Sequence, residues 1–232
     1  MTADLHTHLL PEMDDGCASL EESLLLLSEL KKQGVSAVSL TPHFYADREA
    51  PETFFSRREA AFRRLSEALL PDAPALFCGA EVWYYSGISG TEKPEDFAIG
   101  RTGLFLLELP FENWTDSMAR EVLAIHRHRG IRVVLAHIDR YLSFLDPAML
   151  EEFCSEGVLL QANADSFLER KTQKKVLSLL KNGMIHFVAS DCHDAAVRRP
   201  RLDEAYSVIR KKLGPGAVKW LSDYSKVFFT GE

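Results

Sequence analysis

The sequence of 232 residues has few cysteines and no long apolar run. Its four cysteines are widely spaced and include no C-x-x-C pair, which argues against a disulfide framework or a zinc ribbon. The run Leu24–Leu27 is far shorter than a membrane span, and no basic leader with an apolar stretch precedes Asp4. We therefore expect a reduced cytoplasmic protein that does not insert into a membrane.

Positive charge is also in short supply. Lys and Arg number 27 against 34 Asp and Glu, which gives a net charge of −7. The surface as a whole should therefore not attract nucleic acid or an anionic membrane, although a local basic cluster could still hold one anion. Repeats, low-complexity tracts and linkers are lacking as well. The length suits one large α/β domain over residues 1–232.

Apolar strand-like runs alternate with amphipathic helical stretches along the chain. Strands are expected at 5–9, 35–40, 75–82, 104–109, 131–136, 158–162 and 186–189. Helices are expected at about 20–33, 51–70, 114–129, 147–156, 166–181 and 201–212, before a tail with Trp220 and Phe228-Phe229. Short strands separated mostly by helices indicate a parallel sheet.

Polar residues with metal-binding side chains stand at the carboxyl ends of most of these strands. The runs VSLTPH, FCGAE, LLELP, VVLAH and FVASD each end in such a residue. Barrel enzymes place their chemistry at this face, whereas an open doubly wound sheet collects ligands at one switch point. Contributions from six of the seven strands favour a ring of strands.

Two pairs, His6/His8 near the start and Asp191/His193 near the end, each enclose one residue. Side chains two apart on a strand project to the same face and can reach one ion or two neighbouring ions. The candidate metal ligands are His6, His8, Asp15, His43, Glu81, Glu108, His137, Asp191 and His193. Five imidazoles and four carboxylates suit Mn, Fe or Zn, and so much negative charge favours two or three ions.

The alternative interpretation is that these residues are structural. A single histidine after a strand is more often a hydrogen-bonded core or loop residue than a ligand. Glu108 resists this interpretation, because a carboxylate within Leu-Leu-Glu-Leu must be paired or coordinated. The whole set together favours a metal centre.

The ordered motifs H-T-H…D-D-G, T-P-H, G-A-E, L-E-L, A-H-I-D-R-Y and S-D-C-H-D resemble those of the PHP (polymerase and histidinol phosphatase) superfamily. Within it, the chain is most similar to bacterial manganese-dependent protein-tyrosine phosphatases encoded with capsule and exopolysaccharide synthesis genes. The resemblance runs from His6 to about Pro200. It implies a distorted TIM-like (β/α)7 barrel with a metal site at the carboxyl ends of the strands. It also implies three ions, with Mn²⁺ favoured over Fe or Zn.

The resemblance further implies how the ligands divide. The first metal would be held by His6, His8, Glu81 and Asp191. The second would be held by Glu81, Glu108 and His137, with Glu81 bridging. The third would be held by Asp15, His43 and His193. Asp15 is preferred to Asp14 because its position relative to His6 matches the family motif.

Two arginines that bind phosphate are also expected from the resemblance. Arg140, shortly after His137, looks like the first. The second should precede a proline after the Asp191-Cys192-His193 motif, which favours Arg199, with Arg198 as the alternative. Arg198 and Arg199 could instead be solvated residues at a helix start.

The activity implied is metal-dependent hydrolysis of phosphotyrosine in a bacterial tyrosine kinase of polysaccharide export, by direct attack of a hydroxide that bridges the metals. Cys192 and Arg198 match the C-x5-R spacing of cysteine phosphatases, but the segment lacks the glycines of a phosphate-binding loop. The alternatives are a small-molecule phosphatase of the histidinol-phosphate type and a non-catalytic metal- or phosphopeptide-binding module. Trp83, Tyr84 and Tyr85 could stack on a phenyl ring or pack within a loop. No feature of the sequence indicates an oligomeric state.

Overall fold

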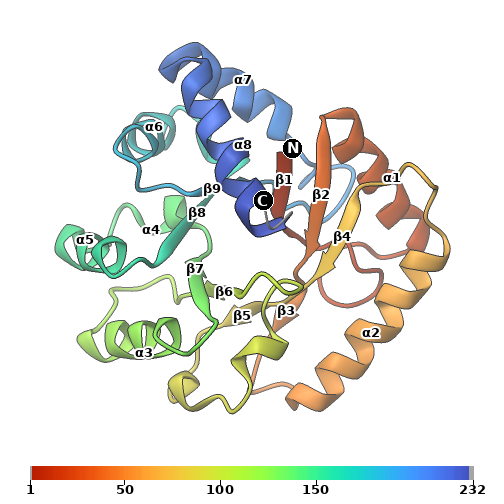
Figure 1. Cartoon of the computed structure of the whole chain (residues 1–232), viewed down its shortest axis with the longest axis horizontal. Helices are drawn as coiled ribbons and strands as arrows, with labels where there is room; N and C mark the ends of the chain where they lie inside the picture. The colour runs from red at the N-terminus through yellow and green to blue at the C-terminus, as the bar shows by residue number, and fades with distance from the viewer. Residues whose placement is uncertain (1, 230–232) are drawn as a thin grey trace.

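The computed structural model describes residues 2–229, which form strands surrounded by helices (Figure 1). The strands are β1 (Thr2–Thr7), β2 (Val35–Leu40), β3 (His43–Phe44), β4 (Ala75–Cys78), β5 (Glu81–Trp83), β6 (Leu104–Glu108), β7 (Arg132–Leu135), β8 (Leu159–Asn163) and β9 (Phe187–Ala189). They pair in parallel in the orders β1-β2-β4 and β3-β5-β6-β7-β8-β9. The predicted parallel sheet is confirmed.

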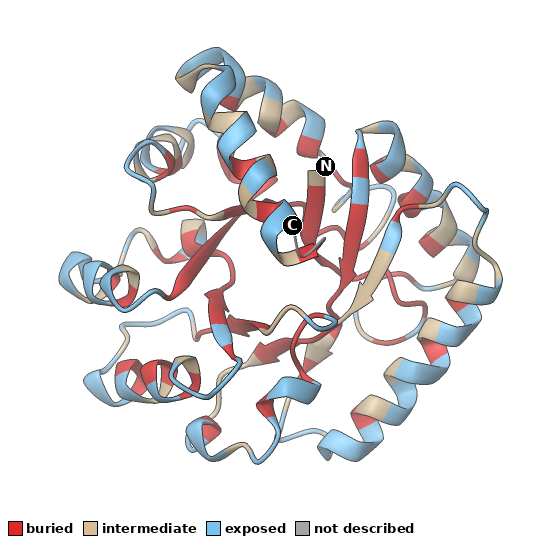
Figure 2. Ribbon diagram, in the orientation of Figure 1, coloured by how far each residue is buried: buried red, intermediate tan, exposed pale blue. Residues whose placement is uncertain are grey.

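The helices lie outside the strands, and their exposed faces contrast with the buried strands (Figure 2). They are α1 (Leu20–Lys32), α2 (Pro51–Glu67), α3 (Asp116–His126), α4 (Ile138–Tyr141), α5 (Pro147–Ser155), α6 (Gln173–Lys181), α7 (Leu202–Leu213) and α8 (Pro215–Phe229). Short 3-10 helices occur at Ile88–Gly90, Pro94–Asp96 and Ala164–Phe167.

Two of the nine strands found between residues 2 and 229 continue a neighbour after a bend. The strand predicted at 75–82 is in fact β4 followed by β5, and β2 is continued by β3 in the same way. The bend lies at Gly79, whose N–H donates to Leu40 O at 2.9 Å and where a Cβ would lie 2.8 Å from Ile99 Cγ1. Counting each bent pair once leaves seven strand positions (9 − 2 = 7).

The ring of strands closes at its carboxyl end. Thr7 and Cys192 form an isolated parallel bridge, next to which His8 N donates to Cys192 O at 2.9 Å and Asp191 N donates to His6 O at 3.0 Å. These bonds join the segment that contains His6 and His8 to the segment that contains Asp191 and His193. The predicted distorted seven-stranded barrel is therefore the architecture observed.

Local sequence signals explain most helix boundaries. Ser19 caps α1 by accepting from Glu22 N at 3.2 Å, and the Glu22 carboxylate accepts from Ala18 N at 3.0 Å. The helix predicted over 166–181 is wrong in its first half. There, Thr172 Oγ1 donates to Ser166 O, and Gln173 Nε2 donates to Phe167 O, each at 2.7 Å, so side chains satisfy two carbonyls that a continuing helix would pair with backbone N–H groups.

The C-terminal tail forms α8, a helix that the sequence did not predict. Its aromatic residues Tyr224, Phe228 and Phe229 pack with the interior cluster that contains Leu5 and Phe187. These contacts lie near the amino ends of the strands, opposite the candidate ligands. Among residues 2–229, no helix combines the length and the apolar character needed to cross a membrane.

Candidate metal centre

A β-bulge in β1 turns His6 and His8 toward the interior. Asp4 pairs with Val38 and Thr7 with Leu40, so β1 has one more residue than β2 across this interval. Leu5, at the start of this interval, belongs to the interior apolar cluster. An extra residue reverses which side chains face inward, so even-numbered positions point to the interior beyond it. His6 and His8 are both fully buried, and their Nε2 atoms lie 3.1 Å apart.

Two other candidate ligands sit where the backbone leaves its strand in an unusual conformation. His137 follows β7 with φ 53°, and Asp191 follows β9 with φ 52°. Positive φ is uncommon outside glycine, and such strain concentrates at functional sites. The left-handed turn re-aims each side chain toward the centre of the ring, where both are buried.

The D-D-G motif after β1 folds back over His8. A Cβ on Gly16 would lie 2.1 Å from His8 O, so only glycine permits this approach. The turn brings Asp14 Oδ2 to 2.7 Å from His8 Nδ1, and the same oxygen accepts from His43 N at 2.9 Å. Asp14 therefore orients two candidate ligands, a function that sequence reasoning missed, while Asp15 is left to face the centre.

Glu81 lies at the middle of the cluster. Its Oε2 is 3.1 Å from His6 Nε2, 3.3 Å from His8 Nε2 and 3.0 Å from His43 Nδ1. Its Oε1 is 2.8 Å from His137 Nε2. One buried carboxylate thus contacts four imidazoles contributed by three different segments of the chain.

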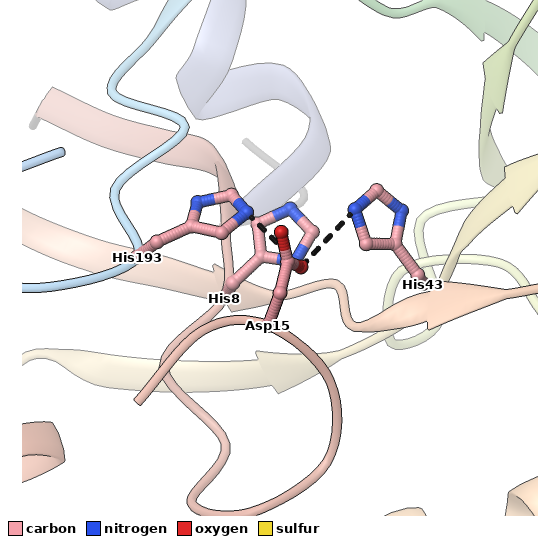
Figure 3. A group of neighbouring side chains, drawn as sticks. All are labelled: His8, Asp15, His43 and His193. Carbon is pink, nitrogen blue, oxygen red and sulfur yellow. Dashed lines mark ion pairs between the residues drawn. The ribbon is translucent and has the colours of Figure 1, made fainter. Parts of the chain in front are cut away.

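The nine predicted ligands form four overlapping groups whose donor atoms lie within 4.8 Å of one another. The groups are His8/Asp15/His43/His193, His6/His137/Asp191, His6/His8/Glu81 and His43/Glu81/Glu108. Figure 3 shows the first of these, in which Asp15 Oδ1 lies 3.5 Å from both His43 Nε2 and His193 Nε2. The predicted set Asp15/His43/His193 is brought together intact. The members of the other two predicted sets also lie close together: Asp191 Oδ1 is 3.6 Å from His6 Nε2 and 3.5 Å from His8 Nε2, and His137 Nε2 is 2.8 Å from Glu81 and 3.7 Å from Glu108. His137 additionally groups with His6 and Asp191, so the division of the ligands among the ions stays a prediction.

Several donor atoms in the cluster are buried without a hydrogen-bond partner, as expected for atoms that face a cation. They are His43 Nδ1, Glu81 Oε2, Asp191 Oδ1 and His193 Nε2. Burial and the neighbouring Glu81 carboxylate raise the pKa of Glu108 to about 7. Burial would lower the pKa of His137, but Asp191 and Glu81 outweigh it and raise that pKa to about 9. Excess negative charge and unpartnered donors both fit a metal centre.

Strand β8 supplies two further residues that sequence reasoning missed. Gln161 Oε1 accepts from His137 N at 3.0 Å and lies 3.3 Å from His6 Nδ1. Asn163 Oδ1 lies 2.9 Å from His137 Nδ1, and Asn163 Nδ2 donates to Asp191 Oδ2 at 2.9 Å. The sequence did contain a signal for these two residues. Both amides lie in the apolar run LLQAN, and a buried amide, like the carboxylate of Glu108, must find a polar partner. Such contacts orient metal ligands and fix their tautomers.

Of the predicted arginines, the structure brings Arg140 and Arg198 to the cluster. An Nη2 of each lies close to Asp191 Oδ2, at 2.7 Å for Arg140 and 2.9 Å for Arg198. Arg199, the residue preferred from the sequence, turns instead to Glu204 at 3.2 Å. The two adjacent arginines therefore have different partners, and the one at the cluster is Arg198, the alternative that the sequence left open.

The alternative chemistry of a cysteine nucleophile finds no support in the geometry. Cys192 is fully buried, and burial raises its pKa well above the ordinary value. A thiolate nucleophile requires the opposite shift and access to substrate. Among the aromatic residues left open, Tyr84 donates its hydroxyl to Glu121, and Tyr85 pairs with Thr91.

The capsular polysaccharide synthesis family CpsB/CapC matches residues 2–225. Tyrosine-protein phosphatase CpsB of Streptococcus agalactiae serotype III (strain NEM316) is 30% identical over 225 residues, covering 91% of this chain and 90% of the relative. Tyrosine-protein phosphatase YwqE of Bacillus subtilis (strain 168) is 27% identical over 221 residues, covering 91% and 85%.

Solved structures show the same fold. The chain matches a structure from work on YwqE of Bacillus subtilis and CpsB of Streptococcus pneumoniae, described as unique metal-dependent tyrosine phosphatases, with a TM-score of 0.86 and 22% identity. That match covers 100% of this chain and 95% of the other. Histidinol phosphate phosphatase of Lactococcus lactis, solved with zinc, L-histidinol and phosphate, matches with a TM-score of 0.53 and 13% identity, covering 92% and 93%.

Proposed function

The chain belongs to the CpsB/CapC family of capsular polysaccharide synthesis, and from that premise we propose that it removes phosphate from phosphotyrosine by metal-dependent hydrolysis. The observation that carries this function is the convergence of nine imidazole and carboxylate side chains, several with buried unpartnered donor atoms, beside two guanidinium groups. This combination provides ligands for divalent cations together with donors for a phosphate.

We assign the nine predicted ligands to two or three ions, with Mn²⁺ as the favoured metal. All nine donors are nitrogen or oxygen, which suits manganese as well as iron or zinc. When bound, the ions would supply positive charge for the phosphoryl oxygens and lower the pKa of a water. Asp14, Gln161 and Asn163 would hold the ligand side chains in place through their second polar atoms.

Arg140 and Arg198 would bind the non-reacting phosphoryl oxygens. Their guanidinium groups meet at one carboxylate oxygen, Asp191 Oδ2, so both already point at the same small region. A dianionic phosphate offers several acceptor oxygens there, and charge-assisted bonds to it would strengthen as charge develops during hydrolysis. The physiological substrate we propose is phosphotyrosine of a tyrosine kinase of polysaccharide export.

The function is tested with the purified full chain and para-nitrophenyl phosphate. We expect hydrolysis with Mn²⁺ and its abolition by EDTA. Activity that survives the chelator, or no activity with Mn²⁺, would contradict the metal-dependent mechanism. Rates on a phosphotyrosine peptide and on histidinol phosphate then separate a protein phosphatase from the small-molecule alternative, and the metal content of protein purified without added metal identifies the native ion.

A further inference from the structure

Three neighbouring strands each place an aromatic residue just beyond a candidate ligand. Tyr45 follows His43 by two positions, directly after β3 ends, and Trp83 follows Glu81 by two positions in β5. Residues two apart on a strand share a face, so each ring lies one step farther toward the open end of the barrel than its ligand. β3 pairs with β5 and β5 with β6, so these rings are neighbours.

The third ring comes from the segment after β6, where Phe111 follows Glu108. We call Tyr45, Trp83 and Phe111 the aromatic arc. Its ring centroids are 6.1 Å apart between Tyr45 and Trp83 and 6.2 Å apart between Trp83 and Phe111. One end lies 5.2 Å from the ring of His43, and the other places Phe111 5.8 Å from the guanidinium carbon of Arg140. The arc therefore spans from a candidate metal ligand to a candidate phosphate-binding arginine.

The rings of the arc keep free surface. Phe111 is 49% exposed, and Tyr45 and Trp83 are half-buried. Tyr45 also borders a hollow of about 660 Å³ that is lined by Asp15 and His43. Aromatic rings left open beside a polar centre can receive another ring in stacked or edge-to-face contact.

The arc is also held in place before any substrate arrives. Phe111 stacks on Tyr141 at 5.4 Å, and the Tyr141 hydroxyl donates to Leu109 O at 2.7 Å and accepts from Leu109 N at 3.1 Å. The guanidinium of Arg48 covers one face of Tyr45 at 3.9 Å. Rings that are already fixed lose little conformational freedom on binding, which favours affinity.

We propose that the aromatic arc is an aryl subsite, which receives the phenyl ring of the substrate while the phosphate lies at the metal centre. This inference rests on the proposed function and adds the basis of selectivity. A phosphoserine side chain has no ring to contact the arc, so the subsite would select aryl over alkyl phosphates. One good ring contact corresponds to roughly a tenfold preference.

The subsite is tested by calorimetric binding of two non-hydrolysable ligands, phenylphosphonate and methylphosphonate, to the Mn²⁺-loaded full chain. The wild type should bind phenylphosphonate roughly tenfold more tightly. Trp83→Ala and Phe111→Ala should each lose most of that preference while methylphosphonate affinity stays the same. Phe111→Leu removes the ring but keeps apolar bulk at this exposed position, so it tests the same loss of preference with less risk of misfolding. Trp220→Ala removes a half-exposed aromatic side chain from α8 and is the matched control.

Each outcome decides the inference. An unchanged preference in both variants would overturn the subsite, and an equal loss of both ligands would show that the rings only support the metal centre. If the wild type bound neither phosphonate with Mn²⁺ present, the proposed function would fail and the subsite with it. A kinetic check follows the ratio of variant to wild-type kcat/KM on phenyl phosphate, which should fall about tenfold for the arc variants and stay near one for Trp220→Ala.

Discussion

Asn163 Oδ1 lies 2.9 Å from His137 Nδ1 and thereby leaves His137 Nε2 as the ring nitrogen that faces Glu81. For this contact to be a hydrogen bond, His137 must carry its proton on Nδ1. The Nδ2 of the same amide donates to Asp191 at 2.9 Å, so one side chain orients two candidate ligands. We therefore expect an amide in this position to influence metal affinity without touching the metal.

Asn163→Leu removes both bonds, together with the bond that Asn163 Oδ1 accepts from Gln161 Nε2 at 2.9 Å, while nearly conserving volume. We expect the affinity for Mn²⁺ to fall roughly 10–100-fold, because contacts to the second atom of a ligand contribute on this scale. Titration of the metal-stripped protein measures it, and Asn113→Leu, at an exposed loop position, serves as the matched control. Equal affinities for Asn163→Leu and wild type would show that the amide is not needed to orient the ligands.

Glu81→Gln should remove more than one metal ion from the protein. Its carboxylate contacts four imidazoles, whereas Glu108 reaches His137 only at 3.7 Å and His43 at 3.9 Å. Glu81→Gln removes a negative charge and a carboxylate oxygen from every ion that Glu81 would help to hold. We therefore expect activity to drop by about 100-fold or more. Elemental analysis after gel filtration gives the metal-to-protein ratio. Glu108→Gln is the matched comparison, and an equal loss of metal in the two variants would contradict a central bridging function for Glu81.

Arg198→Ala and Arg199→Ala should behave very differently. Arg198 lies 2.9 Å from Asp191, and Arg199 pairs with Glu204 on the exposed side of the loop. Loss of a charge-assisted bond to phosphate should lower kcat/KM on para-nitrophenyl phosphate about 10–100-fold for Arg198→Ala. Arg199→Ala should stay within about twofold, because exposed ion pairs contribute little. The reverse order would restore the assignment of phosphate binding to Arg199.

The sequence predicts well which residues belong to this site, because candidate ligands can be recognised at the ends of apolar strands. It predicts poorly where their side chains point, because that depends on the local backbone conformation. Glu81 and Glu108 could be found because a buried carboxylate in an apolar strand must be paired or coordinated. The β-bulge that turns His6 inward and the positive φ of Asp191 leave no signal in the pattern of residue types. The same is true of the loop in which the adjacent residues Arg198 and Arg199 contact different partners.

The fold shows the same division. Alternating apolar runs and amphipathic stretches were enough to predict the parallel ring, because burial on both faces selects near-continuous apolar strands. The break at Gly79 was not predictable, since it depends on how close Ile99 approaches from a distant segment. The helix α8 was missed for a related reason: its aromatic residues Phe228 and Phe229 pack under the amino ends of strands, and that contact exists only once the ring has formed.

A histidine outside the metal centre should make the stability of the protein depend on pH. His186 Nδ1 accepts a hydrogen bond from Leu160 N at 3.1 Å, which requires the neutral ring. Burial lowers the pKa of His186 to about 4, whereas its ordinary value is about 6.5. Between these values the unfolded chain binds a proton that the folded protein does not, so stability rises with pH and is lost as the pH falls from about 6.5 toward 4.

Urea unfolding of the EDTA-treated protein at about pH 7 and about pH 5 measures this dependence without the competition between protons and metal. His186→Gln keeps an acceptor oxygen for Leu160 N but does not titrate. From about pH 7 to about pH 5, its unfolding free energy should therefore fall by about 1 kcal/mol less than that of the wild type; this figure already includes a reduction for partial solvent exposure. His128→Gln, at an exposed position, should follow the wild type. Parallel profiles for wild type and His186→Gln would contradict the prediction and would mean that the acid sensitivity of the fold arises in other titratable groups.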